Sequence, residues 1–183
     1  MRYTIFSLIL MILLSVVSSC SNSSADRIRI SDEARKKIQQ QADGTISLNI
    51  DKASCYNNVQ NPSSNTAEWD FVVSKAGRYS VWLSSATVDT MHLQYASSVK
   101  ISLLDERLDV KPVGDKIVLD ANDVKYPYYR ADSYMGSFYI QEPGEYSIQV
   151  ISEKVRSKKE IASAPATANH TKLMSVILTP MTQ

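Results

Sequence analysis

Aromatic and charged side chains gather in one short stretch of the chain. Five of the ten tyrosines are Tyr126, Tyr128, Tyr129, Tyr134 and Tyr139, and Arg130 and Asp132 lie among them. Sugars have apolar C–H faces that stack on aromatic rings, and hydroxyls that need polar partners. Tyrosine and arginine also dominate the centres of protein interfaces. The stretch therefore predicts a loop that binds a glycan or a protein, and the alternative is that the rings only pack the loop onto its domain.

Residues that could catalyse a reaction are sparse. Glu68 and Asp70 share one face of a predicted strand, about 7 Å apart by strand rise, which is within the range of glycosidase carboxylates. We favour the alternative that this face is simply solvated. His92 and His170 lie in polar segments without metal-ligand spacing. The sequence predicts a non-enzyme, and a glycan hydrolase is the alternative.

No cofactor is predicted. A structural calcium ion held by Asp51, Asp70 or Asp89 is an alternative, because carboxylate oxygens are the ligands that calcium prefers. The formal net charge of the chain is +1. Without a basic excess, nucleic acid is not expected as a partner.

Short segments with alternating apolar and polar residues must position these side chains. Period-two alternation predicts strands with one buried face. In two places a tight turn joins two alternating segments: Glu68–Ser84 around Gly77, and Tyr134–Ile151 around Pro143-Gly144. Each is interpreted as a hairpin. Further strands are predicted at Thr45–Ile50, Val99–Leu104, Leu108–Val110, Lys116–Leu119 and Lys172–Leu178. The pattern predicts an all-β protein, an antiparallel β-sandwich of jelly-roll type with about eight strands.

Two other segments complete the expected organisation. Ser31 can cap a short N-terminal helix over Ile30–Ala42, and Gly44 can end it. Residues 121–132 are expected to form a loop. The helix has a thin apolar face, so it is expected to cover an edge or serve as a spacer.

The two tryptophans separate by strand phase. Trp69 is in phase with Phe71 and Val73 and is predicted to lie in the core. Trp82 is out of phase with Val81 and Leu83, so it points away from the core. We expect the N-terminal helix to cover Trp82, and an exposed binding platform is the alternative.

Several of these motifs occur in a familiar order. The stretch AEWDFVVSKAGRYSVWLS, the glycines and aromatic residues between Gly136 and Ile148, and the closing Ser175–Pro180 resemble the galactose-binding-like jelly rolls attached to bacterial polysaccharide-degrading enzymes. The resemblance covers Gly44–Pro180. It implies a sandwich fold and carbohydrate binding. Many members of that family begin with an acidic calcium-binding strand, and Thr45–Ile50 lacks that pattern.

The N-terminal sequence predicts that the protein is located in the cell envelope. Arg2 precedes an apolar run, Ile5–Val17, of signal-peptide length. The following Val17-Ser18-Ser19-Cys20 resembles a bacterial lipobox, which implies cleavage before Cys20 and lipidation of that residue. An ordinary secretory signal is the alternative. With Cys20 lipidated, no second cysteine is left to form a disulfide within the chain, and Cys55 is expected to be a small buried residue.

These observations combine into one hypothesis. Residues 1–19 form a lipoprotein signal, residues 20–43 a lipidated tether with the short helix, and residues 44–183 the sandwich domain. The expected protein is a non-catalytic, lipid-anchored carbohydrate-binding protein of the bacterial outer membrane, and the alternative is an envelope protein that binds another protein. The candidate ligand-binding residues are Trp82, Tyr126, Tyr128, Tyr129, Arg130, Asp132 and Tyr134.

Overall fold

Two stacked β-sheets make up the domain. A computed structural model describes residues 37–156 and 171–181. The strands within these residues are β1 Ile38–Gln39, β2 Ile46–Asn49, β3 Ser54–Tyr56, β4 Thr66–Val73, β5 Gly77–Thr87, β6 Val99–Leu103, β7 Glu106–Val110, β8 Lys116–Val118, β9 Tyr129–Ile140, β10 Gly144–Ile151 and β11 Lys172–Pro180. Helical structure in the described part is limited to two short 3₁₀ turns, Ile50–Lys52 and Pro62–Ser64. The predicted all-β sandwich is confirmed.

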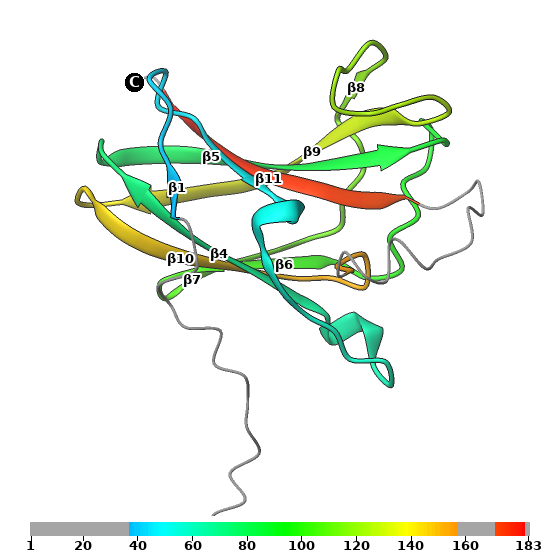
Figure 1. Ribbon diagram of the computed structural model, residues 1–183, viewed down its shortest axis with the longest axis horizontal. Helices are drawn as coiled ribbons and strands as arrows, with labels where there is room; N and C mark the ends of the chain where they lie inside the picture. The colour runs from blue at the N-terminus through cyan, green and yellow to red at the C-terminus, as the bar shows by residue number, and fades with distance from the viewer. Residues whose placement is uncertain (1–36, 157–170, 182–183) are drawn as a thin grey trace, which may run out of the picture. The chain divides into compact units, whose positions relative to one another are not determined.

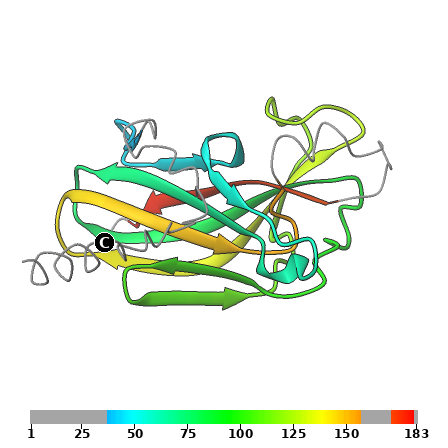
Figure 2. The ribbon, with the colours of Figure 1, turned by 60° about the horizontal axis from the view of Figure 1, so that its bottom comes forward.

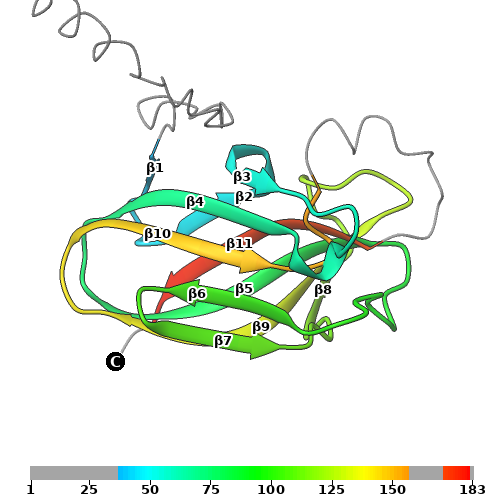
Figure 3. The same ribbon diagram turned by 90° about the horizontal axis from the view of Figure 1, so that it is seen from below.

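The two sheets have different strand orders. The six-stranded sheet runs β1-β4-β10-β6-β7, with β3 also paired to β4, and the five-stranded sheet runs β2-β11-β5-β9-β8. All neighbours are antiparallel except β1, which pairs with β4 in parallel. Figures 1 and 3 show the sheets as two layers, with β4, β10, β6 and β7 in one and β5, β11 and β9 in the other.

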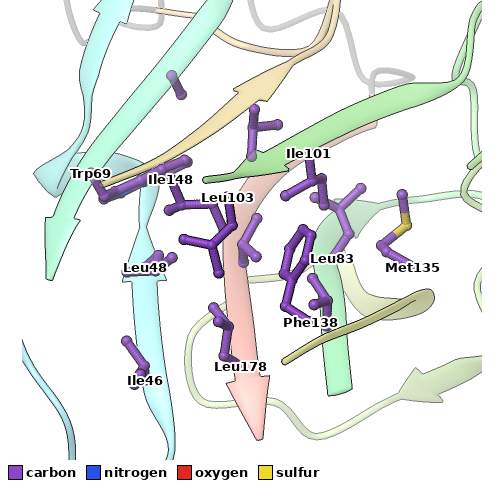
Figure 4. Packing of buried hydrophobic residues seen from close by; sticks show 14 of the residues in the cluster. Ile46, Leu48, Trp69, Leu83, Ile101, Leu103, Met135, Phe138, Ile148 and Leu178 are labelled. Carbon is purple, nitrogen blue, oxygen red and sulfur yellow. The ribbon is translucent and has the colours of Figure 1, made fainter. Parts of the chain in front are cut away.

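The core lies between the facing sides of the two sheets. Period-two alternation is clear in β4, where every second residue is buried. Trp69 is 1% exposed, as its phase predicted, and its indole Nε1–H donates to the Asn49 carbonyl oxygen at 2.7 Å. Figure 4 shows Trp69, Ile148 and Leu103 from one sheet meeting Leu83, Phe138 and Leu178 from the other. Burial of these side chains is the main stabilising term, about 1.5–3 kcal/mol for each large apolar group.

The two predicted hairpins are wrong, because their strands belong to different sheets. β4 lies in the six-stranded sheet and β5 in the five-stranded sheet, and the same holds for β10 and β9. Each tight turn therefore crosses from one layer to the other, as the arched connections in Figure 2 show. A short turn between alternating strands fixes the direction reversal, but it does not fix the hydrogen-bonding partner.

The N-terminal helix prediction is wrong over its described end. Ile38–Gln39 form β1 beside Phe71 and Val72 of β4, and Ile38 is buried against the core. Tertiary pairing has overridden the weak helical pattern. The remainder of the predicted helix lies outside the described residues. Within residues 37–156 and 171–181, no helix has the length and apolar character required to cross a membrane.

A single side chain ties β1 to the turn between β4 and β5. Gln40 Oε1 accepts hydrogen bonds from Ser74 N at 2.8 Å and Lys75 N at 3.1 Å. Its Nε2 donates to Gly44 O at 2.6 Å and to Tyr79 Oη at 2.8 Å. Gln40 therefore anchors the end of β1 to the turn at which the chain passes from β4 in one sheet to β5 in the other.

Candidate functional site

The outer face of the five-stranded sheet carries a row of apolar side chains. Strand register places Ile177 of β11 beside Trp82 of β5, and Trp82 beside Tyr134 of β9. The Trp82 and Tyr134 rings lie 5.3 Å apart between centroids and are tilted by 58°. Trp82 is half-buried, whereas Tyr134 is 43% exposed. The described end of the helix expected to cover Trp82, residues 37–42, is not helical, and the rest of that segment lies outside the described residues.

A polar row runs beside the apolar one. Register aligns Ser175, Ser84, Asp132 and Lys116 across β11, β5, β9 and β8. Ser84 Oγ donates to Asp132 Oδ1 at 2.6 Å. The face thus offers a carboxylate and an ammonium group next to aromatic rings.

Arg130 is held by two carboxylates at the end of this face. Its Nη1 lies 3.3 Å from Asp123 Oδ2, and its Nε lies 3.3 Å from Asp132 Oδ1. Nε is buried and has no hydrogen-bond partner among the described residues, so its contact with Asp132 is an ion pair without hydrogen-bond geometry. Asp132 is only 7% exposed. A carboxylate this buried needs partners, and Arg130 and Ser84 supply them.

A β-bulge in β9 determines which side chains reach this face. Val81 pairs with Gly136 and Trp82 pairs with Tyr134, so Met135 is the extra residue. Met135 is 1% exposed, in the core. A bulge shifts the side-chain alternation by one residue. Tyr134, Asp132 and Arg130 consequently point outward, on the same side of the sheet as Tyr139.

A shallow hollow of about 310 Å³ lies over the two rows. It is lined by Trp82, Lys116, Asp132, Ile177 and Thr179. Its walls combine apolar surface with a hydrogen-bond acceptor and a cationic donor. That combination suits a ligand with apolar faces and hydroxyl groups.

The predicted site residues divide into two groups. One group comes together on the outer face: Trp82, Arg130, Asp132 and Tyr134. The last three lie on β9, which starts at Tyr129, so the prediction of a loop over residues 121–132 is wrong from residue 129 onward. The remaining three tyrosines are not in the hollow. Tyr126 is 91% exposed in the loop between β8 and β9, Tyr129 is half-buried, and the Tyr128 ring lies 4.4 Å from Lys172 Nζ.

Three residues that line the hollow were not predicted from the sequence: Ile177, Thr179 and Lys116. Ile177 and Thr179 are out of phase with the buried Val176 and Leu178 of β11, and this alternation was a usable signal. Lys116 gave no such signal, because its position depends on β8 pairing with β9.

The alternative catalytic and metal-binding residues lie elsewhere. Glu68 and Asp70 are on the outer side of the six-stranded sheet, where Ser147 Oγ donates to Glu68 Oε1 at 3.3 Å. The backbone N–H groups of Met91 and His92 lower the pKa of Asp89. Among residues 37–156 and 171–181, no three His, Cys, Asp or Glu side chains are grouped to hold a metal ion. Cys55 is half-buried against the core, and His170 lies outside the described residues.

A second hollow of about 310 Å³ occurs at the end of the six-stranded sheet. Its lining includes Asn58, Val59, Asn65, Glu153 and Arg156, from the loop before β4 and the segment after β10. None of the predicted site residues contributes to it.

Comparison with known proteins relates the chain to others by fold. No protein-family model matches the sequence, and no curated protein matches it. The α-L-fucosidase from Vibrio sp. strain EJY3 has a similar structure, with a TM-score of 0.59 and 20% identity over 79% of this chain and 24% of the fucosidase. At this identity the likeness establishes a shared fold.

Two further structures have lower TM-scores. The GH26-CBM35 β-(1,4)-mannanase from Podospora anserina has a TM-score of 0.46 and 12% identity over 77% of this chain and 28% of the mannanase. The mosquito-larvicidal Cry4Aa toxin from Bacillus thuringiensis has a TM-score of 0.43 and 12% identity over 81% of this chain and 25% of the toxin. This chain therefore spans less than a third of the length of each of the three proteins.

Proposed function

We propose that this protein is a non-catalytic carbohydrate-binding protein, held at the bacterial outer membrane by a lipid on Cys20. The observation that carries the binding role is the outer face of the five-stranded sheet. There Trp82 and Tyr134 offer ring surface for the C–H faces of a sugar, and Asp132 and Lys116 offer an acceptor and a donor for its hydroxyls. The fold shared with an α-L-fucosidase, an enzyme named for a sugar, is in keeping with this proposal.

The arrangement of charges also favours a sugar. Arg130 and Ser84 already balance Asp132, so its carboxylate can accept a further hydrogen bond without an unpaired buried charge. Lys116 has no ion pair or hydrogen bond with another described residue, so its ammonium group is available to a ligand. A hydroxyl-rich molecule uses both groups at once.

A glycan array of varied polysaccharides tests the binding role. The full chain, purified in detergent, is compared with a Trp82→Ala variant. Trp82 is half-buried on the outer face, so we expect the variant to fold and to lose at least tenfold in affinity, about 1.4 kcal/mol. The matched control is Tyr139→Ala, because Tyr139 is exposed at 51% on the same face of β9 and does not line the hollow. Equal binding by all three proteins would contradict the proposed site, and absence of binding would favour a protein partner.

The lipid anchor requires its own experiment. The lipobox-like Val17-Ser18-Ser19-Cys20 supports it, and these residues lie outside the described part of the chain. Cells expressing the chain are fed a clickable fatty acid and fractionated. We expect label and outer-membrane location in the wild type and neither in Cys20→Ser. Label in Cys20→Ser would contradict the anchor and would leave the binding proposal untouched.

A further inference from the structure

The two rows of the binding face run across the strands. Neighbouring strands are about 4.8 Å apart, so the apolar row from Ile177 through Trp82 to Tyr134 extends roughly 10 Å, and the polar row from Ser175 to Lys116 extends roughly 14 Å. Register fixes both rows at right angles to the strand direction. Ser84 and Ser175 are buried, so the outermost groups open to a ligand are Ile177 on β11 and Lys116 on β8. They are three strand spacings apart, which is longer than one sugar ring.

The hollow follows the same direction. Its five lining residues come from four adjacent strands, with Ile177 and Thr179 on β11, Trp82 on β5, Asp132 on β9 and Lys116 on β8. Asp132 and Lys116 lie on one side of the apolar row, and Thr179 lies on the other. The lining is therefore spread along four strands and is not gathered around one position.

Asp132 and Lys116, on adjacent strands, are suited to hydrogen-bond one edge of a chain. Asp132 can accept hydrogen bonds from sugar hydroxyls, and Lys116 can donate to them. The rings of Trp82 and Tyr134 are tilted by 58°, so consecutive units that stack on them would have to turn relative to each other. A single ring cannot use both platforms.

We propose that this face binds the interior of a glycan chain, lying across the strands, and not a terminal monosaccharide. The inference rests on the proposed carbohydrate-binding function and specifies its ligand class. Ile177 and Lys116 then contact units at opposite sides of the unit that lies over Trp82. Each additional unit along the rows adds contacts until the rows end.

Titration calorimetry with oligosaccharides of increasing length tests the proposal. The probes are β-1,4-linked oligomers of glucose, mannose, galactose and xylose, from the monosaccharide to the hexasaccharide of each. In the series that binds best, we expect Kd to fall at least tenfold from monosaccharide to tetrasaccharide and to change little beyond that. Ile177→Ala should weaken tetrasaccharide binding severalfold, while Tyr139→Ala should leave it unchanged.

The outcomes separate this inference from the function on which it rests. If a monosaccharide binds as tightly as its hexasaccharide, the chain-binding proposal is overturned and the carbohydrate-binding function stands. If affinity rises with length and Ile177→Ala has no effect, the orientation across the strands is wrong. Failure of every oligomer to bind, together with no binding on the glycan array, would overturn both proposals.

Discussion

Trp69 and Trp82 show how strand phase assigns different roles to identical residues. Trp69 is 1% exposed and donates its indole N–H to a backbone carbonyl of β2. Trp82 lies on the outer side of its sheet, and Tyr134 covers only part of its ring. The first contributes burial to stability, and the second keeps ring surface available for a ligand.

Tyr95 gives a prediction about stability at high pH. Its side chain is buried at 3% exposure and shares a 2.8 Å hydrogen bond with Ser85 Oγ. Burial raises the pKa of Tyr95 and the charge of Glu153 raises it further, while the Ser85 hydrogen bond lowers it. The phenol in the unfolded chain ionises near pH 10. Above that pH the folded state holds one more proton, so the free energy of unfolding falls as pH rises, by about 1.4 kcal/mol per pH unit.

Urea denaturation of the wild type and Tyr95→Phe between pH 8 and pH 11 measures this effect. We expect the variant to be about 1 kcal/mol less stable at pH 8, because Ser85 loses its partner. Above about pH 10 its stability should fall less steeply than that of the wild type. Parallel curves in the alkaline range would show that Tyr95 is not the residue responsible.

At the scale of the strand, the bulge in β9 determines the site. Without it, strict alternation from Phe138 would place Tyr134 and Asp132 inside the core. The extra residue, Met135, reverses that phase and brings both side chains to the surface beside Trp82. A bulge leaves little trace in a period-two pattern, so the sequence indicated the right residue types near β9 but not the face on which they meet.

Gly136 makes the bulge achievable. Its φ is +125°, and a Cβ placed there would lie 2.9 Å from Leu108 Cδ2. We expect Gly136→Ala to lower the free energy of unfolding by about 1–3 kcal/mol, because an L-residue is strained in this conformation. The substitution should also displace Tyr134, and glycan binding should become weaker as a result. Chemical denaturation checks the first expectation and calorimetry the second.

The matched control for this glycine is Gly144→Ala at the start of β10. No positive φ occurs there, and the nearest atom to an added Cβ is Tyr146 Cε2 at 3.7 Å. We expect a change of about 0.5 kcal/mol or less. If the two alanine variants were equally stable, the conformational argument for Gly136 would fail.

The longer strands were predictable from the sequence, whereas the short β1 and β3 and the pairing of strands were not. Alternation located β2, β4, β5, β10 and β11 because each buries one face. The partner of a strand depends on contacts distant in sequence, such as β11 beside β5. Trp82 was recognised from its phase as pointing away from the core, while Lys116 was missed because its place in the hollow depends on β8 pairing with β9.

At the scale of the whole molecule, the sandwich leaves two outer faces with different chemistry. The outer side of the six-stranded sheet carries Glu68 and Asp70, and that of the five-stranded sheet carries the rings and the hollow. The core between the sheets holds both faces rigid. Ligand binding by one outer face of this scaffold therefore requires no movement of the strands.

The most direct test uses the two tryptophans as internal probe and control. In a ¹H–¹⁵N spectrum of the full chain in detergent, the Trp82 and Trp69 indole N–H groups give separate signals, assigned with Trp82→Phe. Titration with the tetrasaccharide that binds best should shift the Trp82 signal in proportion to occupancy and leave the Trp69 signal in place. If binding occurs and the Trp82 signal does not move, the glycan lies elsewhere on the protein and the assignment of the outer face is wrong.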